Sequence, residues 1–406
     1  MTKEKVIPQI RFSGFTDTWE QRKFSELTEI RSASRVHKEE WQSSGVPFYR
    51  SSDVMAALNG TENEKAFISE ELYEKLSAVS GKLEKGDVLV TGGGSVGKPY
   101  IVPNNEPLYT KDADLLWIKN NENLDPYFVY TFFFSPTFTD YLNSVSHVGT
   151  IAHYTITQLG ETPITLPCVS EQQKIGDYFR NLDSIITLHQ RKYDKLTKVK
   201  KAMLEKMFPE NGSPYPEIRF KGFTDAWEQR KLGECAEFNP KSELPDIFEY
   251  VDLESVVGTD ILSHRTESKS SAPSRAQRLA QKGDVFYQTV RPYQKNNCIF
   301  ENDENNWVFS TGYAQLRPVN DGYFLLTLLQ NEDFVKLVLD RCTGTSYPAI
   351  NSNDLADIDV NIPINNLEQQ RIGDYFRNLD SLITLHQRKL EKLKNIKKAC
   401  LEKMFV

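Results

Sequence analysis

The chain has 406 residues, a formal net charge of −7, 11% aromatic residues and five cysteines. This length accommodates two or more domains that each bury a core without disulfide staples. No apolar run approaches the roughly 20 residues that span a bilayer, the opening MTKEKVIPQIRF lacks the apolar segment of a secretory signal, and the cysteines form no CxxC pair. We therefore expect a cytoplasmic protein without membrane spans, disulfides or a metal site.

The chain is internally repeated. A short block at residues 8–27 returns at 216–235 with 14 of 20 positions identical. The stretch PENGSPYP after Phe208 has the composition of a linker. The expected organisation is an N-terminal block (1–27), a first variable region (28–170), a central helix (171–208), a linker with the repeated block (209–235), a second variable region (236–367) and a C-terminal helix (368–406).

The two helical segments are nearly the same sequence. Residues 171–208 and 368–405 are identical at 30 of 38 positions, and no proline or glycine interrupts 177–208. Apolar residues recur at steps of three and four, which predicts one buried stripe on each helix. At about 1.5 Å per residue, 36 residues make a rod of roughly 54 Å, so we interpret the pair as a coiled-coil spacer. Two unrelated helices that pack on their own domains are the alternative. The stripe residues are Phe179, Leu182, Ile186, His189, Tyr193, Leu196, Phe376, Leu379, Ile383, His386, Leu390 and Leu393.

The two variable regions differ in sequence but keep common landmarks. Lys85-Gly86-Asp87 corresponds to Lys282-Gly283-Asp284, and Gly149-Thr150 corresponds to Gly344-Thr345. Short β-rich runs alternate with Gly and Asn turns, and helix-like segments follow at 126–142 and 322–339. The fold class that this predicts is α+β, with two diverged copies of one α/β domain.

Charge is unevenly distributed. Each long helix carries nine Lys or Arg against five Asp or Glu, a net +4, which leaves −15 for the rest of the chain. Basic helices between acidic domains are suited to a phosphate backbone or an acidic partner protein, although a solvated helix face has the same pattern.

The sequence contains no convincing catalytic site. Gly92 to Lys98 fits the spacing G-x-x-x-x-G-K of a nucleotide-binding loop, but Pro99 stands where a Mg²⁺-binding hydroxyl is required and a strand-like run follows. A hairpin turn, or a turn whose backbone approaches DNA, remains open. Asp125-Pro126-Tyr127-Phe128 is only a partial match to the motif of amino-group methyltransferases, so we predict no catalysis by this chain.

Base reading requires arginine, amide and hydroxyl side chains in loops. Such residues gather at matching places in the two variable regions. In the first region the candidates for DNA binding are Arg50, Ser51, Ser52, Thr91, Gly92, Gly93, Gly94, Ser95, Lys98, His147, Thr150, His153 and Tyr154. In the second region they are Tyr287, Gln288, Thr289, Arg291, Tyr293, Gln294, Lys295, Thr343, Thr345, Ser346 and Tyr347.

With these motifs, the chain resembles the specificity subunit of type I restriction-modification systems over essentially its whole length. The resemblance is carried by the duplicated order of variable region and helix, EQQ(K/R)I at Glu171 and Glu368, LHQRK at Leu188 and Leu385, and FxGFTDxWEQRK at Phe12 and Phe220.

The resemblance implies that each variable region is a target recognition domain reading one half of a split DNA sequence. It implies two antiparallel helices that set the gap, and a non-catalytic chain related to itself by a pseudo-two-fold axis. Half-sites of two-fold binders lie about one helical turn, roughly 34 Å, apart. Because the two domains differ, we expect an asymmetric target.

The implied partners are double-stranded DNA, two methyltransferase (modification) subunits and two restriction subunits that translocate DNA. No cofactor is expected in this chain, whereas the partners would use S-adenosylmethionine, and ATP with Mg²⁺. The acidic balance predicts weak DNA binding by the isolated chain. Two alternatives stay open: a bivalent protein-interaction scaffold on a coiled-coil spacer, and a nucleotide-using enzyme built on Gly92 to Lys98.

Overall fold

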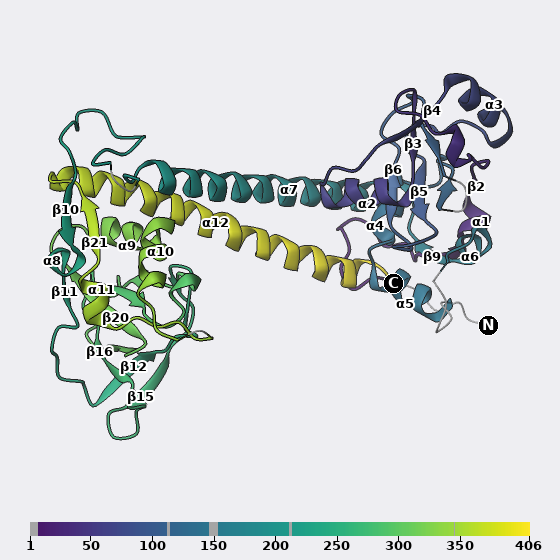
Figure 1. Cartoon of the computed structure of the whole chain (residues 1–406). Helices are drawn as coiled ribbons and strands as arrows, with labels where there is room; N and C mark the ends of the chain where they lie inside the picture. Colours follow the sequence, from purple (N-terminus) through teal and green to yellow (C-terminus); the bar gives the residue numbers. More distant parts are fainter. Residues whose placement is uncertain (1–6, 112–113, 146–152, 211–212, 345) are drawn as a thin grey trace. The chain divides into compact units, whose positions relative to one another are not determined.

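The computed structural model describes residues 7–111, 114–145, 153–210, 213–344 and 346–406. The chain divides into two compact units, one formed by Met1–His189 with Lys389–Val406 and the other by Gln190–Arg388. Each unit therefore contains one variable region, the first half of the helix that follows it and the last part of the other repeat's helix. Figure 1 colours the chain along its sequence and labels these elements.

Unit 1 is an α+β domain. Its elements are β1 (Glu20–Lys23), α1 (Phe24–Leu27), β2 (Ile30–Ser32), η1 (Lys38–Glu40), β3 (Val46–Tyr49), α2 (Ser51–Asn59), β4 (Ala66–Ile68), α3 (Glu70–Ser80), β5 (Val88–Thr91), β6 (Pro99–Ile101), β7 (Tyr109–Thr110), β8 (Leu115–Ile118), α4 (Pro126–Phe132), α5 (Pro136–Val145), α6 (Ile156–Glu161), β9 (Pro163–Leu166) and the start of α7 (Val169–Lys206). The strands form sheets in the orders β2-β8-β5-β6, β4-β3-β7 and β1-β9.

Unit 2 repeats this plan with other side chains. Its elements are β10 (Glu228–Lys231), α8 (Leu232–Cys235), β11 (Ala236–Phe238), β12 (Ile247–Val251), β13 (Val256–Val257), β14 (Asp260–Ile261), β15 (Arg265–Ser268), β16 (Ala276–Leu279), β17 (Val285–Gln288), η2 (Pro292–Gln294), β18 (Cys298–Ile299), β19 (Trp307–Ser310), β20 (Tyr313–Pro318), α9 (Gly322–Gln330), α10 (Glu332–Asp340), α11 (Ser352–Ala356), β21 (Asp359–Ile362) and α12 (Asn366–Met404). Its sheets are β11-β20-β17-β18, β15-β12-β19-β16, β13-β14 and β10-β21.

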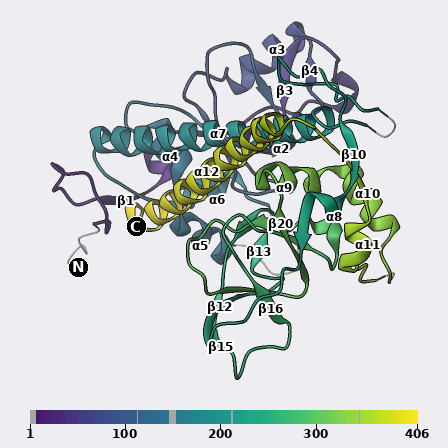
Figure 2. The same ribbon diagram turned by 90° about the vertical axis from the view of Figure 1, so that its left-hand side faces the viewer.

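The sheets of unit 1 have counterparts in unit 2, which adds strand β16 and the β13-β14 pair. β3 pairs antiparallel with β4 and parallel with β7, and β12 pairs antiparallel with β15 and parallel with β19. Figure 2 shows that in unit 2 the sheet containing β12, β15 and β16 lies on the side away from α12, with α9 nearer to that helix. The prediction of two diverged copies of one α/β domain is confirmed.

Two predicted helical segments are each broken in two. The segment 126–142 consists of α4 and α5, and the break falls at Pro136, which lacks the N–H that a continuing helix requires. The segment 322–339 consists of α9 and α10 because the Asn331 side chain accepts a hydrogen bond from the Asp333 N–H at 2.8 Å and so begins a new helix.

The end of each long helix completes the core of one unit, and the end of α12 does so in the unit formed mainly by the first part of the chain. The Phe405 ring lies 5.3 Å from the ring of Phe128 and 6.1 Å from that of Phe179, all in unit 1. In unit 2, Phe208 lies 5.8 Å from Trp227 and 5.9 Å from Phe324. Because the EKMF ending is the same in both helices, the same kind of aromatic socket receives it in both units.

Within each unit the two helical segments run antiparallel. In unit 1, Asp183 pairs with Lys397 at 2.6 Å, while the Tyr178 hydroxyl lies 3.5 Å from the Cys400 sulfur. The residue numbers therefore rise along one helix as they fall along the other. The predicted stripe is partly buried. Phe179, Leu182, Phe376, Leu379 and Leu390 are buried, and the remaining stripe residues, Ile186, His189, Tyr193, Leu196, Ile383, His386 and Leu393, are half-buried.

The EQQ(K/R)IG opening of each helix is a joint between helix and domain. The buried carboxylate of Glu171 accepts two hydrogen bonds from the Arg11 guanidinium, at 2.7 and 2.8 Å, and Glu368 receives the same pair from Arg219. The Gln172 side chain accepts the Asp125 N–H at 3.0 Å. The motif therefore fastens the short repeated block and the variable region to one helix end.

Glycine is required in this joint because α4 and α9 begin against the helices. A Cβ at Gly176 would stand 2.3 Å from Asp125 Oδ1 and 3.0 Å from the Phe128 N, and a Cβ at Gly373 meets Asp321 and Phe324 in the same way. Asp125 caps α4 through the Phe128 N–H at 2.8 Å. The Asp-x-Tyr-Phe run is therefore a helix start packed on the long helix of its unit.

No helix in the described part of the chain is long and apolar enough to cross a membrane.

Candidate nucleic-acid interface

In unit 1 the glycine-rich stretch is the loop of a β-hairpin. β5 and β6 pair antiparallel, with Val90 opposite Pro99, so Gly92 to Lys98 connects two strands. A nucleotide-binding loop of this type leads into a helix whose N-terminus holds phosphate. The nucleotide-enzyme alternative is therefore wrong about the structure around this loop.

The hairpin loop is held from inside by Thr91. Its buried hydroxyl donates to the Ser95 carbonyl and accepts the Lys98 N–H at 2.8 Å. Gly97 has φ of +74° and lies on the ring of Phe138, where a Cβ would come within 2.8 Å. Gly94 and Ser95 are exposed at the tip. The result is a fixed turn that presents backbone and a small hydroxyl to solvent.

Two further predicted segments lie beside this loop. The Asp114 carbonyl accepts both the Ser51 hydroxyl at 3.0 Å and the Gly92 N–H at 2.7 Å, and this brings the start of α2 to the hairpin. The Gly92 carbonyl accepts the Tyr154 N–H at 2.7 Å, which places exposed His153 near Gly93. Three stretches far apart in sequence thus form one surface.

Some unit 1 candidates are engaged inside the protein. Arg50 pairs with Asp53 at 3.0 Å, donates to the Glu64 carbonyl and lies over the Trp41 ring. The buried Tyr154 hydroxyl bonds to Thr162, and burial raises the pKa of this tyrosine. Ser52 is exposed and accepts from Asn63. His147 and Thr150 lie outside the described residues.

Unit 2 builds the matching surface from η2 and residues 343–344 and 346–350. The Arg291 N–H donates to the Pro348 carbonyl at 2.7 Å and the Ile350 N–H to the Thr289 carbonyl at 3.0 Å, so the two loops are paired by their backbones. Exposed side chains here are Tyr293, Gln294, Thr343, Ser346 and Tyr347, with half-buried Arg291 among them. Thr345 lies outside the described residues.

Three predicted base readers of unit 2 are supporting residues. Tyr287, Gln288 and Thr289 are buried, and burial raises the pKa of Tyr287. Gln288 donates to the Val290 carbonyl at 2.7 Å and to Gln294 at 2.9 Å, and the Thr289 hydroxyl donates to the Gly312 carbonyl at 2.8 Å. These side chains, like Thr91 and Tyr154, hold the loops and do not reach solvent. Lys295 pairs with Glu332 at 2.6 Å and is likewise engaged.

The sequence did not single out every charged group at these surfaces. In unit 1, Lys111 pairs with Asp114 at 2.7 Å beside the hairpin. In unit 2, Arg275 is exposed, and its carbonyl accepts the Thr311 N–H. Arg275 therefore lies next to the turn at Gly312, whose carbonyl supports Thr289. Burial lowers the pKa of Arg278 on the following strand, β16. Only strand pairing brings these residues to the loops, and no local motif marks them.

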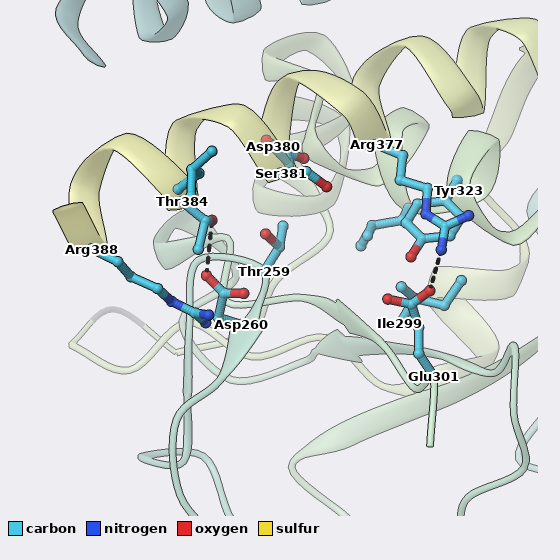
Figure 3. Close-up of a pocket in the computed structure, with 12 residues that line it drawn as sticks. Thr259, Asp260, Ile299, Glu301, Tyr323, Arg377, Asp380, Ser381, Thr384 and Arg388 are labelled. Atoms are coloured by element: carbon cyan, nitrogen blue, oxygen red, sulfur yellow. Dashed lines mark hydrogen bonds and ion pairs between the residues drawn. The ribbon is translucent and has the colours of Figure 1, made fainter. Parts of the chain in front are cut away.

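A separate open hollow of about 430 Å³ lies in unit 2 between α12 and the β13–β14 hairpin. Figure 3 shows Arg377 reaching Glu301, and Thr384 reaching Asp260, across this space. Arg377 also lies over the Tyr323 ring at 4.6 Å. Two of its charged groups, Arg377 and Glu301, are thus paired with each other, and Asp380 pairs with Lys200 at 2.5 Å. Among the described residues there is no group of three or more His, Cys, Asp or Glu side chains arranged to hold a metal ion.

Comparison with known proteins gives one consistent result. The family model "Type I restriction modification DNA specificity domain" matches twice, over residues 16–198 and 224–395. The type I restriction enzyme HindI specificity subunit of Haemophilus influenzae is 25% identical over 193 residues, 44% of this chain and 41% of that protein. The MjaIX specificity subunit of Methanocaldococcus jannaschii is 22% identical over 340 residues, 79% of this chain and 77% of that protein.

A solved structure has the same fold over nearly the whole length. The S subunit of a type I restriction-modification system from M. genitalium superimposes with a TM-score of 0.57 at 17% identity, covering 98% of this chain and 99% of that one. The sequence match spans less than half the length of the two Haemophilus relatives. Since the family model covers both units, the chain belongs to the family of type I restriction-modification DNA specificity proteins.

Proposed function

We propose that this chain is the DNA-specificity subunit of a type I restriction-modification complex and that each unit reads one half of a bipartite, asymmetric target. The observation that carries the proposal is the paired loop surface built twice on one framework. Corresponding backbones present Gly94, Ser95 and His153 in unit 1 but Arg291, Tyr293 and Tyr347 in unit 2. Different side chains on equal frameworks are suited to different half-sites.

The chain has a non-catalytic role in this proposal. Adenine-N6 methylation with S-adenosylmethionine, and ATP- and Mg²⁺-dependent translocation and cleavage, belong to partner subunits. Within this chain, the loops select the sequence and the helices hold the two units. With a net charge of −7, the isolated chain has weak affinity for DNA, and the partners provide much of the phosphate contact.

Two copies of the modification subunit fit the duplicated helices. Ile185 and Leu382 are 43% and 44% exposed, and Leu188 and Leu385 are 50% and 44% exposed, at corresponding positions of the two repeats. Exposed apolar side chains in groups are typical of protein interfaces. Because the two surfaces have nearly the same sequence, they suit two copies of one partner. Restriction subunits then complete the complex.

The test is to co-express the chain with its modification subunit and map N6-methyladenine on plasmid DNA by single-molecule sequencing. The expected result is a split motif with a fixed gap and one methylated adenine on each strand. Exchanging residues 28–170 for those of another family member is the matched control, and it should change one half-site only.

The alternative outcome is also informative. A stable complex that methylates no defined motif would favour the bivalent protein-interaction scaffold. A region exchange that altered both half-sites would contradict the assignment of one half-site to each unit.

A further inference from the structure

The two hairpin loops share an unusual backbone conformation. Gly94 stands seven residues after Asp87, and Arg291 stands seven residues after Asp284, the corresponding aspartate of the repeat. Their φ angles are +68° and +56°. Glycine adopts this left-handed conformation freely, whereas a residue with a Cβ does so rarely. Unit 2 thus places an arginine where the same fold in unit 1 has the residue best suited to the backbone.

The surrounding contacts fix the Arg291 backbone in place. Its N–H donates to the Pro348 carbonyl at 2.7 Å, and its carbonyl accepts the Gln294 N–H at 3.0 Å. The buried Gln288 side chain donates to the Val290 carbonyl at 2.7 Å and so holds the residue before Arg291. A strained conformation that persists under such contacts is typical of functional positions.

The side chain is oriented but not neutralised. The guanidinium lies 4.4 Å from the centre of the Tyr347 ring, and Tyr347 is itself 63% exposed. In the described residues no carboxylate pairs with Arg291, whereas its neighbour Lys295 is paired with Glu332 at 2.6 Å. A stacked guanidinium keeps its donors free along the edge of the plane, and this arrangement suits a bidentate contact to guanine O6 and N7.

We propose that Arg291, stacked on Tyr347, is a specificity-determining residue of unit 2 that reads a guanine in its half-site. This inference rests on the proposed DNA-specificity function. Tyr347 is a positioning residue for the guanidinium. Gly94 leaves unit 1 without an equivalent side chain, so the two units read their half-sites by different chemistry.

The experiment compares wild type, Arg291→Gly, Arg291→Lys and Tyr347→Phe, each co-expressed with the modification subunit, by mapping methyladenine on plasmid DNA carrying randomised sites. Both Arg291 variants should accept other base pairs at one G·C position, with a loss of discrimination of about tenfold or more. Exchanging residues 236–367 for those of another family member should change one half-site, and this G·C position should lie in that half-site. Tyr347→Phe keeps the ring and should keep the motif.

Matched measurements separate reading from folding. Arg265→Lys alters an arginine that is paired with Asp252 at 2.6 Å and Glu267 at 2.8 Å, and should leave the motif unchanged. Arg291→Gly removes the backbone strain together with the ring contact, so its melting temperature should stay within about 4 °C of wild type.

Three results would overturn the inference. The first is an unchanged motif in Arg291→Gly, and the second is a large decrease in the melting temperature of the same variant. The third is full wild-type discrimination in Arg291→Lys, which would assign the residue to phosphate attraction alone. Absence of any split motif with the wild-type chain would instead contradict the proposed function.

Discussion

Replacing Phe405 tests whether the end of α12 is part of the core of unit 1. It is 4% exposed and packs against Phe128, Phe132 and Phe179 of unit 1, with ring centres 5.3 to 6.5 Å apart. Replacing a buried phenylalanine with alanine costs about 3–5 kcal/mol. For a unit of about 200 residues, where 1 kcal/mol shifts the melting temperature by about 2–4 °C, a cost near 4 kcal/mol predicts a decrease of about 8–16 °C.

Hydrogen exchange read by mass spectrometry locates the effect. In Phe405→Ala, amides of residues 7–189 should lose protection, although the substitution is more than 200 residues away in sequence from most of them, and amides of 213–388 should exchange as in wild type. Phe208→Ala is the matched control with the reverse pattern, because Phe208 fills the corresponding socket beside Trp227 and Phe324. A Phe405→Ala chain that lost less than about 1 kcal/mol, or that lost protection equally in both units, would refute the reasoning.

Three further substitutions probe the joints. Gly373→Ala should destabilise unit 2 by about 1–3 kcal/mol in urea unfolding, because the new Cβ would lie 2.8 Å from the Phe324 N. This cost should exceed the gain from the better helix propensity of alanine. Equal or higher stability of the variant would contradict this close packing. Arg11→Met should lower the free energy of unfolding by about 3–5 kcal/mol, because it leaves the buried Glu171 carboxylate without its partner. Adding Glu171→Met should restore much of this loss. No recovery in the double variant would argue against an unpaired buried charge as the cause. Burial raises the pKa of Asp321, and the folded state therefore binds this proton more tightly than the unfolded state, so its contribution to stability falls as pH rises through the folded pKa. Asp321→Asn should then be more stable than wild type in urea at pH 7 and lose this advantage below about pH 4; the same difference at both pH values would point to another cause.

The repeats allowed much of the fold to be predicted. The near-identical helices, the KGD landmarks and the Gly-rich turns indicated two copies of an α/β domain on a helical pair, and family membership and sheet topology agree. Residue type was less informative at the loops. Thr91, Gln288 and Arg291 are all suited to base reading, yet Thr91 and Gln288 are buried supports. Arg291 is half-buried, and its guanidinium lies over the Tyr347 ring without a carboxylate partner among the described residues. The left-handed backbone of Arg291 was not visible in the sequence, because a non-glycine residue gives no signal of a positive φ.

By itself, the sequence determined that each long helix has one apolar face and that the short block, variable region and helix occur twice in the same order. The tertiary structure decided which surface each apolar face covers. A stripe of residues records that a helix is half-buried but not what covers it, since the hydrophobic effect has no direction. Only the folded chain places Phe405 in the core of the first unit and Phe208 in that of the second. Only backbone pairing between distant loops separates the residues that support the proposed recognition surface from those exposed on it.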